Sequence, residues 1–171
     1  MENKISTTNN NNDCYLRLKI NLENNNPPDY RTPLYYESWI WEGDKSVLPY
    51  KWTELVNDSK ISIPGIKDYS NTDDFLKKNY YKNPEFDEKS FLFTTNRSQT
   101  AGCAYLDNNY VIKFLIVRKN HKNRQVEHSL ISRAIKRAIE KAADKEKEIE
   151  VKVDLALTNV RKDVFEIFGF I

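Results

Sequence analysis

The stretch that most limits the fold is residues 110–143, which read as a strand, a basic loop and a long helix. Residues 110–117 are apolar except for Lys113 and rich in β-branched side chains, which is typical of a strand buried on both faces. The connection 118–124 has no apolar residue. From Val126 onwards, apolar residues recur at steps of three and four, which predicts an amphipathic helix. The first amides of a helix are unpaired and its dipole is positive there, so this loop is suited to phosphate.

The flanking residues predict a mixed α/β fold around a central mixed sheet. Residues 91–95 and 100–106 read as strands that form an antiparallel meander with residues 110–117, because short polar turns separate them. Gly102 inside the middle strand indicates a bulge or a close approach of two backbones. Residues 149–157 alternate between apolar and polar side chains and follow the long helix. Strand, helix and strand together predict a parallel, right-handed crossover.

The remaining elements are shorter. We expect a first strand over residues 14–22 and two short helices over 50–56 and 73–81. Residues 35–41 form the most aromatic stretch and favour either a strand or an aromatic wall beside a cleft. A last helix over 162–168 should end at Gly169, because glycine is common directly after a helix.

Composition indicates one domain over residues 14–171, preceded by an Asn-rich and Thr-rich tail, 1–13, that we expect to be disordered. The charge balance of 27 basic and 25 acidic residues argues against a nucleic-acid partner. Two cysteines and two histidines cannot supply a zinc site of usual ligand number, so no metal is expected. Neither a signal peptide nor a membrane-length apolar run is found in the sequence, so we expect a cytoplasmic protein without a membrane partner.

The strand–loop–helix unit resembles motif A of the GNAT superfamily of N-acetyltransferases. In that family the loop has the form Arg/Gln-x-x-Gly-x-Gly/Ala, and its amides hold the pyrophosphate of acetyl-CoA. Residues 122–127 fill the loop here, with Gln125 and Glu127 where the family usually has glycine and glycine or alanine. Asn123-Arg124-Gln125-Val126 also resembles the middle of the loop of glucosamine-phosphate N-acetyltransferases.

The end of the chain resembles motif B of the same family, which has an Asn after a strand, an aromatic residue (often Tyr) in a short helix, and a final Gly-Phe. Asn159, Phe165 and residues 169–170 match these places. The resemblance covers roughly residues 91–171. In many members the Tyr protonates the leaving thiolate, which Phe165 cannot do.

The resemblance implies a V-shaped acetyl-CoA cleft between the strands 110–117 and 149–157. Backbone N–H groups near Ile116 and Val117 should bind the thioester oxyanion. The residues expected at the cofactor are Leu115, Ile116, Val117, Lys122, Asn123, Arg124, Gln125, Val126, Glu127, His128, Asn159 and Phe165. The candidates for the base that takes the amine proton are Asp107, Glu37 and Tyr110, for which the alternatives are a turn carboxylate, a surface charge and an ordinary strand aromatic.

The expected function is acetyl transfer from acetyl-CoA to a primary amine, in particular a small molecule such as glucosamine 6-phosphate. The alternative is a GNAT-like binding or interaction protein that has lost catalysis. Family members continue beyond the Gly-Phe into further strands. The C-terminal strands are therefore expected to be missing or supplied by a partner, as in a homodimer, because the strand 149–157 would otherwise be an open edge. His121 and His128 are expected at the surface, and His128 could also contact phosphate.

Overall fold

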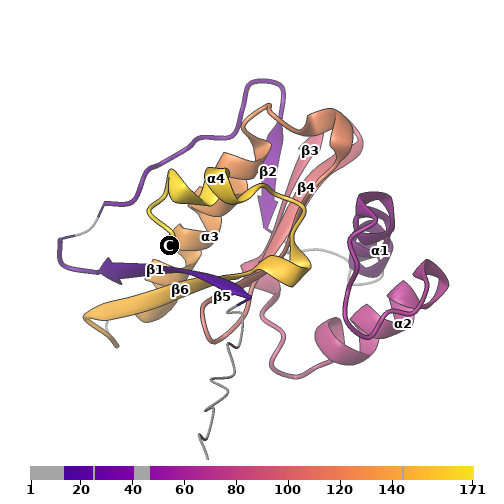
Figure 1. The fold of residues 1–171 in the computed structure, drawn as a ribbon, viewed down its shortest axis with the longest axis horizontal. Helices are drawn as coiled ribbons and strands as arrows, with labels where there is room; N and C mark the ends of the chain where they lie inside the picture. The colour runs from indigo at the N-terminus through magenta and orange to yellow at the C-terminus, as the bar shows by residue number, and fades with distance from the viewer. Residues whose placement is uncertain (1–13, 25, 41–46, 144) are drawn as a thin grey trace, which may run out of the picture.

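The structure is a computed structural model that describes residues 14–24, 26–40, 47–143 and 145–171. The expected disordered tail, 1–13, lies outside the described residues, as does the end of the aromatic stretch at Trp41. The described residues form a six-stranded mixed sheet with the order β1-β6-β5-β4-β3-β2 (Figure 1). Its strands are β1 Tyr15–Asn21, β2 Glu37–Ile40, β3 Phe91–Asn96, β4 Gln99–Leu106, β5 Val111–Val117 and β6 Glu148–Asp154.

Helices cover both faces of this sheet. The long helix α3, Val126–Ala142, packs on one face together with α4, Lys162–Glu166. The helices α1, Val47–Ser59, and α2, Thr72–Leu76, lie on the other face (Figure 1). No helix in the described ranges is long and apolar enough to cross a membrane.

The pairing of the central strands confirms the predicted topology. β3, β4 and β5 form an antiparallel meander, and β5 and β6 are parallel on either side of the α3 crossover. This agreement has a simple cause: short turns force antiparallel neighbours, whereas a helical crossover returns the chain in the same direction. The mixed α/β fold class is therefore confirmed.

β6 is not an edge strand, so the expectation that it would be open unless a partner chain supplied its neighbour is wrong. β1 pairs with β6 in antiparallel register, from Tyr15 opposite Asp154 to Asn21 opposite Glu148. On the far side of β1, the Arg17 N–H donates to the Ile171 carbonyl at 2.9 Å. The alternation in β1 turns its apolar residues toward the core. The strand therefore buries these side chains and also pairs with the backbone N–H and C=O groups on the outer edge of β6.

Asp87, in the connection between α2 and β3, forms hydrogen bonds with side chains of α3. Its Oδ2 accepts hydrogen bonds from Ser90 Oγ at 2.6 Å, Arg137 Nη2 at 3.1 Å and Lys141 Nζ at 3.2 Å. Burial raises the pKa of this carboxyl, but the three hydrogen bonds outweigh burial and lower the pKa to about 2. The ionised carboxylate is thus preferred in the folded state.

We expect Asp87→Asn to lower the free energy of unfolding at pH 7 by about 1 kcal/mol, after allowance for solvent screening. Because the pKa is lower in the folded state, this stabilisation is full above an unfolded pKa of about 3.9 and disappears as the pH falls toward 2. Urea unfolding at pH 7 and at pH 2 to 4 measures the difference. Asp29→Asn, at an exposed pair with Lys136, is the control and should change little. An equal loss at pH 7 and pH 2 would contradict this account.

Candidate functional site

The site begins where β5 and β6 part. Pairing between them ends at Ile112 and Val153 and resumes only at a single bridge, Leu115 with Thr158. Between these points Phe114 has a φ of +52°, which is an unusual backbone conformation for a bulky residue inside a strand. The register with β4 shifts at the same level, so β5 carries a bulge here. The bulge bends β5 away from β6 and opens the sheet on that side.

Asn159 closes the far end of this opening. Its side-chain amide accepts from the Val117 N–H and donates to the Val117 carbonyl, both at 2.9 Å. The Thr158 hydroxyl donates to the Leu115 carbonyl at 2.7 Å. The backbone groups of β5 beyond the bulge are therefore paired with the segment after β6, through its side chains and through the Asn159 N–H, which donates to the Leu115 carbonyl at 3.3 Å.

The loop between β5 and α3 contains two residues in the left-handed backbone region. Gln125 has a φ of +63° and directly precedes α3, and Asn123 has a φ of +60°. Glycine is the residue that adopts this left-handed region most readily. Gln125 thus stands in a backbone position that favours glycine.

Glu127 turns its carboxylate back under this loop. Its Oε1 accepts from the Asn123 N–H at 3.1 Å, whereas its Oε2 has no hydrogen-bond partner among the described residues. The residue is only 5% exposed. A carboxylate from within the chain therefore occupies one of the amides that the loop could offer to a bound anion.

A pocket of about 330 Å³ lies beside the loop and the end of β5. The loop, α3 and α4 all contribute to its wall. Its lining residues are Val117, Lys122, Asn123, Gln125, Glu127, His128, Asn159, Val160, Arg161, Asp163, Val164 and Ile167.

The structure thus brings together most of the residues that the sequence assigned to a cofactor. Five of them do not line the pocket: Leu115, Ile116, Arg124, Val126 and Phe165. Leu115, Ile116, Val126 and Phe165 are fully buried in the two cores instead. Phe165 packs edge-on against Phe170, with ring centroids 5.9 Å apart, so the matched aromatic of motif B has a packing role here.

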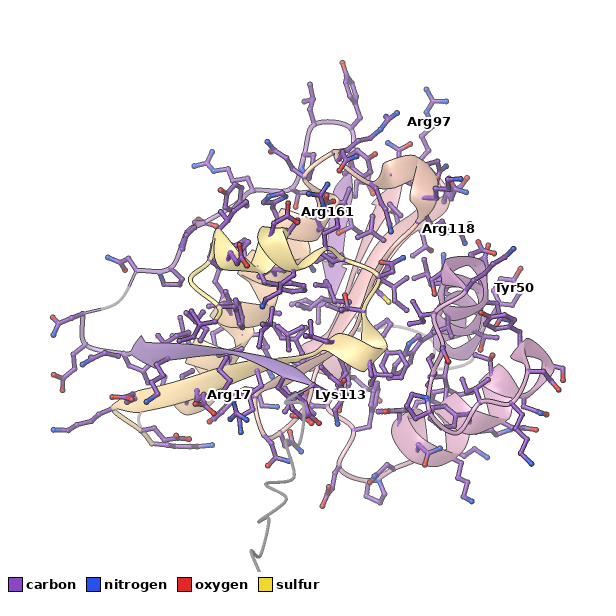
Figure 2. All side chains as sticks on the ribbon, viewed as in Figure 1. Arg17, Tyr50, Arg97, Lys113, Arg118 and Arg161 are labelled. Carbon is purple, nitrogen blue, oxygen red and sulfur yellow. The ribbon has the colours of Figure 1, made fainter. Side chains whose placement is uncertain are left out.

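The α4 side of the pocket was missed. The helix itself was predicted over 162–168, but its contribution to the pocket was not. Val160, Val164 and Ile167 recur at steps of four and three, and this spacing could have indicated an apolar face toward the loop. Arg161 adds a charged group, but its guanidinium is paired with Asp163 at 2.5 Å. Arg118, by contrast, lies beside α1, where it pairs with Glu54 at 2.6 Å and Asp58 at 2.9 Å (Figure 2).

The three candidate bases lie at three different places, and none of them lines this pocket. Asp107 sits in the β4–β5 turn and pairs with Lys113 at 2.9 Å. The Tyr110 hydroxyl donates to Glu146 Oε1 at 2.8 Å, and Glu37 is exposed on β2. Asp107 lies away from the pocket because it belongs to the β4–β5 turn, and Glu37 because it belongs to β2 at the edge of the sheet.

The expectation that His121 lies at the surface is wrong. It is 6% exposed and joins the end of β5 to two other segments. Its Nδ1 is 2.8 Å from the Tyr36 hydroxyl and its Nε2 is 3.0 Å from Gln99 Oε1. Burial, and then the charges of Arg124 and Arg118, lower the pKa of this imidazole, so the neutral ring is favoured. His128 is partly buried and packs on Tyr30, with centroids 5.0 Å apart.

Comparison with known proteins supports the fold. No protein-family model and no curated protein matches the sequence. Among solved structures, a GCN5-related N-acetyltransferase from Sphaerobacter thermophilus matches with a TM-score of 0.61 and 14% identity, over 92% of this chain and 47% of that one. A tandem GNAT protein from the clavulanic acid biosynthesis pathway matches with a TM-score of 0.49 and 9% identity, over 91% and 49%. The first match shows that the chain has the fold of a GCN5-related N-acetyltransferase. The chain spans about half the length of each of these two proteins.

Proposed function

We propose that the protein is an acetyl-CoA-dependent N-acetyltransferase that acts on a primary amine of a small molecule. One observation carries the proposal. The bulge at Phe114 parts β5 from β6, and the pocket of about 330 Å³ lies at the end of the same strand, beside the loop before α3. With its pyrophosphate at the loop and its thioester where β5 and β6 separate, acetyl-CoA would lie along β5. This arrangement suits a long cosubstrate that is anionic at one end.

The chain's own groups define what each part of the site would do. Lys122 and His128 line the pocket beside the loop amides and would contact the pyrophosphate. In the reaction, the amine nitrogen bonds to the acetyl carbon, the carbon–sulfur bond breaks, and the amine proton passes to the thiolate. A thiolate whose conjugate acid has a pKa of about 8 to 9 can leave without a proton donor, so Phe165 is compatible with turnover.

Two contacts favour the alternative, a binding protein without catalysis. Glu127 occupies a loop amide with an internal carboxylate, and Asn159 occupies the Val117 N–H that was expected to bind the oxyanion. Both would have to move for acetyl-CoA to bind and react. The alternative therefore differs from the enzyme in measurable ways: it binds CoA weakly or binds it without turnover.

Glu127→Gly is expected to tighten CoA binding at least about fivefold, because it removes a carboxylate that would repel the pyrophosphate by about 1 kcal/mol or more. Calorimetric titration of CoA and acetyl-CoA into both proteins measures this. Glu127→Gln keeps the size of the side chain without its charge and should give part of the gain. Glu140→Gln, at an exposed residue of α3, is the matched control and should leave affinity unchanged.

Unchanged CoA affinity in both Glu127 variants would place the pyrophosphate elsewhere. Turnover is tested by release of free CoA thiol from acetyl-CoA in the presence of a panel of amines, including glucosamine 6-phosphate and unphosphorylated amino sugars. Thiol release that depends on the amine supports the enzyme. Tight acetyl-CoA binding without thiol release for any amine supports the binding protein.

A further inference from the structure

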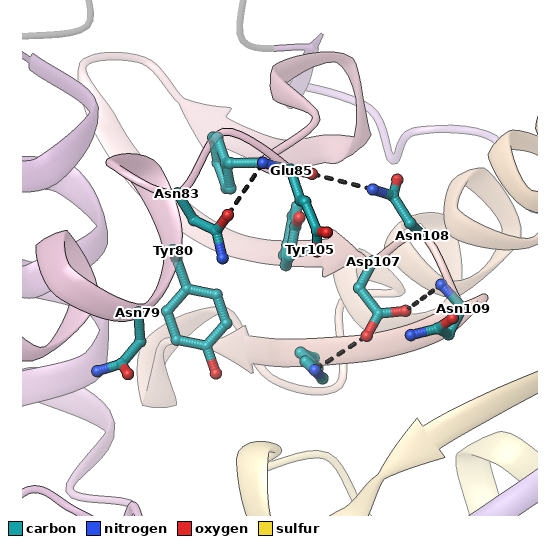
Figure 3. Close-up of a pocket in the computed structure, with 10 residues that line it drawn as sticks. Asn79, Tyr80, Asn83, Glu85, Tyr105, Asp107, Asn108 and Asn109 are labelled. Atoms are coloured by element: carbon teal, nitrogen blue, oxygen red, sulfur yellow. Dashed lines mark hydrogen bonds and ion pairs between the residues drawn. The ribbon is translucent and has the colours of Figure 1, made fainter.

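A second cavity, of about 180 Å³, lies on the face of the sheet that carries α1 and α2. One wall is the chain after α2 and the other is the β4–β5 turn (Figure 3). The residues that line it are Asn79, Tyr80, Asn83, Glu85, Phe86, Tyr105, Asp107, Asn108, Asn109 and Lys113. Most of them are polar, and carboxamides are prominent.

Several polar groups in this cavity have hydrogen-bonding capacity to spare. Within the described residues, the Tyr80 hydroxyl makes no hydrogen bond. Asn83 Oδ1 accepts from the Glu85 N–H at 3.0 Å, which leaves its NH₂ group for a ligand. Asn79 Nδ2 donates to the Phe75 carbonyl at 2.8 Å, which leaves its carbonyl oxygen. The cavity therefore offers both donors and acceptors, a combination that matches hydroxyl groups.

The charges in the cavity argue against a phosphorylated ligand. Lys113 is the one cationic side chain among the described residues that line it. It is paired with Asp107 Oδ2 at 2.9 Å, and Asp107 Oδ1 accepts from the N–H groups of Asn109 and Val111 at 2.9 Å. With the Glu85 carboxylate added, the lining is negative overall. An amine is favoured at such a site, and a phosphate dianion is disfavoured.

The rest of the lining is apolar and flat. Phe86 and Tyr105 stack with ring centroids 4.9 Å apart and an interplanar angle of 25°. Burial raises the pKa of the Tyr105 hydroxyl to about 12, so the phenol stays protonated at neutral pH. A ligand with hydroxyl groups along one edge could hydrogen-bond to the polar side chains of the lining, and its C–H face could pack on the Phe86 and Tyr105 rings.

The cavity reaches the point where β5 and β6 part. Lys113 directly precedes Phe114, the residue at the bulge, and the Tyr80 ring lies 5.0 Å from the Phe114 ring. Burial raises the pKa of the Tyr80 hydroxyl, which also senses the charges of Lys113 and of Asp154 at the end of β6. A group held in the cavity is thus adjacent to the proposed place of the thioester, on the face away from α3.

We infer that this cavity binds the acetyl acceptor, and that the acceptor is a small amine with several hydroxyl groups and no phosphate. The inference rests on the proposed function. It replaces glucosamine 6-phosphate by an unphosphorylated amine, because the lining offers Lys113 alone as a cation and already pairs it.

The test is amide NMR of the full chain, titrated with glucosamine and, separately, with glucosamine 6-phosphate, both without acetyl-CoA. Glucosamine should shift the side-chain amide signals of Asn79 and Asn83, and the phosphorylated sugar should bind at least tenfold more weakly. Tyr80→Phe removes the unpartnered hydroxyl but keeps the ring, and should weaken glucosamine binding about fivefold. Tyr81→Phe is the matched control and should have no effect, because the Tyr81 hydroxyl donates to Asp73, outside the cavity.

Equal or tighter binding of the phosphorylated sugar would overturn the inference. So would the absence of glucosamine binding in a protein that binds acetyl-CoA. Failure of acetyl-CoA to bind, measured separately by calorimetry, would overturn the transferase proposal instead. The two failures are therefore distinguishable.

Discussion

Replacing Trp52 by alanine is expected to lower the free energy of unfolding by about 3–5 kcal/mol. Trp52 is fully buried in α1 and holds that helix against the sheet. Its ring centroid lies 4.7 Å from that of Phe91, 5.0 Å from that of Phe114 and 5.4 Å from that of Tyr80. Removing the indole would leave a cavity between α1, β3, β5 and the segment after α2. These elements are held by the sheet and cannot all move inward to fill it. Urea unfolding of the two proteins measures the loss.

Trp52→Phe is the control for this prediction. The indole N–H is buried and makes no hydrogen bond within the described part of the chain, so phenylalanine removes an unsatisfied donor while it keeps most of the apolar contact. We expect a cost below about 1.5 kcal/mol. A similar cost for both variants would mean that the indole does not fill the space between α1 and the sheet.

Gly102→Ala is expected to lower the free energy of unfolding by about 2–3 kcal/mol. A Cβ at this position would lie 2.7 Å from the Ile116 carbonyl oxygen, 3.1 Å from Leu130 Cδ1 and 3.2 Å from Val117 Cγ2. The nearest atom is backbone and cannot turn aside, so β4 and β5 would have to separate. This confirms the close approach that the glycine predicted. Because β5 would move at Val117, the same variant should also weaken CoA binding.

Gly169→Ala is the comparison for Gly102→Ala, because a side chain at Gly169 would strain the backbone but would not clash with a neighbour. Its Cβ would meet Leu18 Cδ1 at an ordinary 3.5 Å, but the φ of +87° disfavours any side chain. We expect a loss of about 1–2 kcal/mol without an effect on CoA binding. If Gly102→Ala were instead neutral in both measurements, β4 and β5 would not be as close as described.

The order of the elements could be predicted from the sequence because it depends on local signals. Alternation and helical spacing identified β6 and α3, and turn lengths determined the direction of their neighbours. The partner of β1 could not be predicted in this way. Alternation tells which face of a strand is buried, but it does not tell which edge of the sheet the strand joins.

In the candidate site, too, the residues that follow a local signal could be predicted and the contacts that depend on the folded structure could not. Residues on the loop were found because they follow β5 directly, and most of them line one pocket. Glu127 was expected at the cofactor, but its contact with the Asn123 N–H depends on a left-handed turn that the sequence did not predict. Asp107 was chosen for its carboxylate, and its pairing with Lys113 depends on the register after the β4–β5 turn.

The pairing of β1 with β6 has a consequence for biosynthesis. Arg17 of β1 and Glu150 of β6 are 133 residues apart in the chain, yet their side chains join at 3.0 Å. During translation the meander of β3, β4 and β5 can form while β1 still has no neighbour, because β6 leaves the ribosome after all three of these strands. β1 must therefore wait without its partner until β6 has been synthesised, and a nascent chain that stalls before β6 would present β1 to chaperones and proteases.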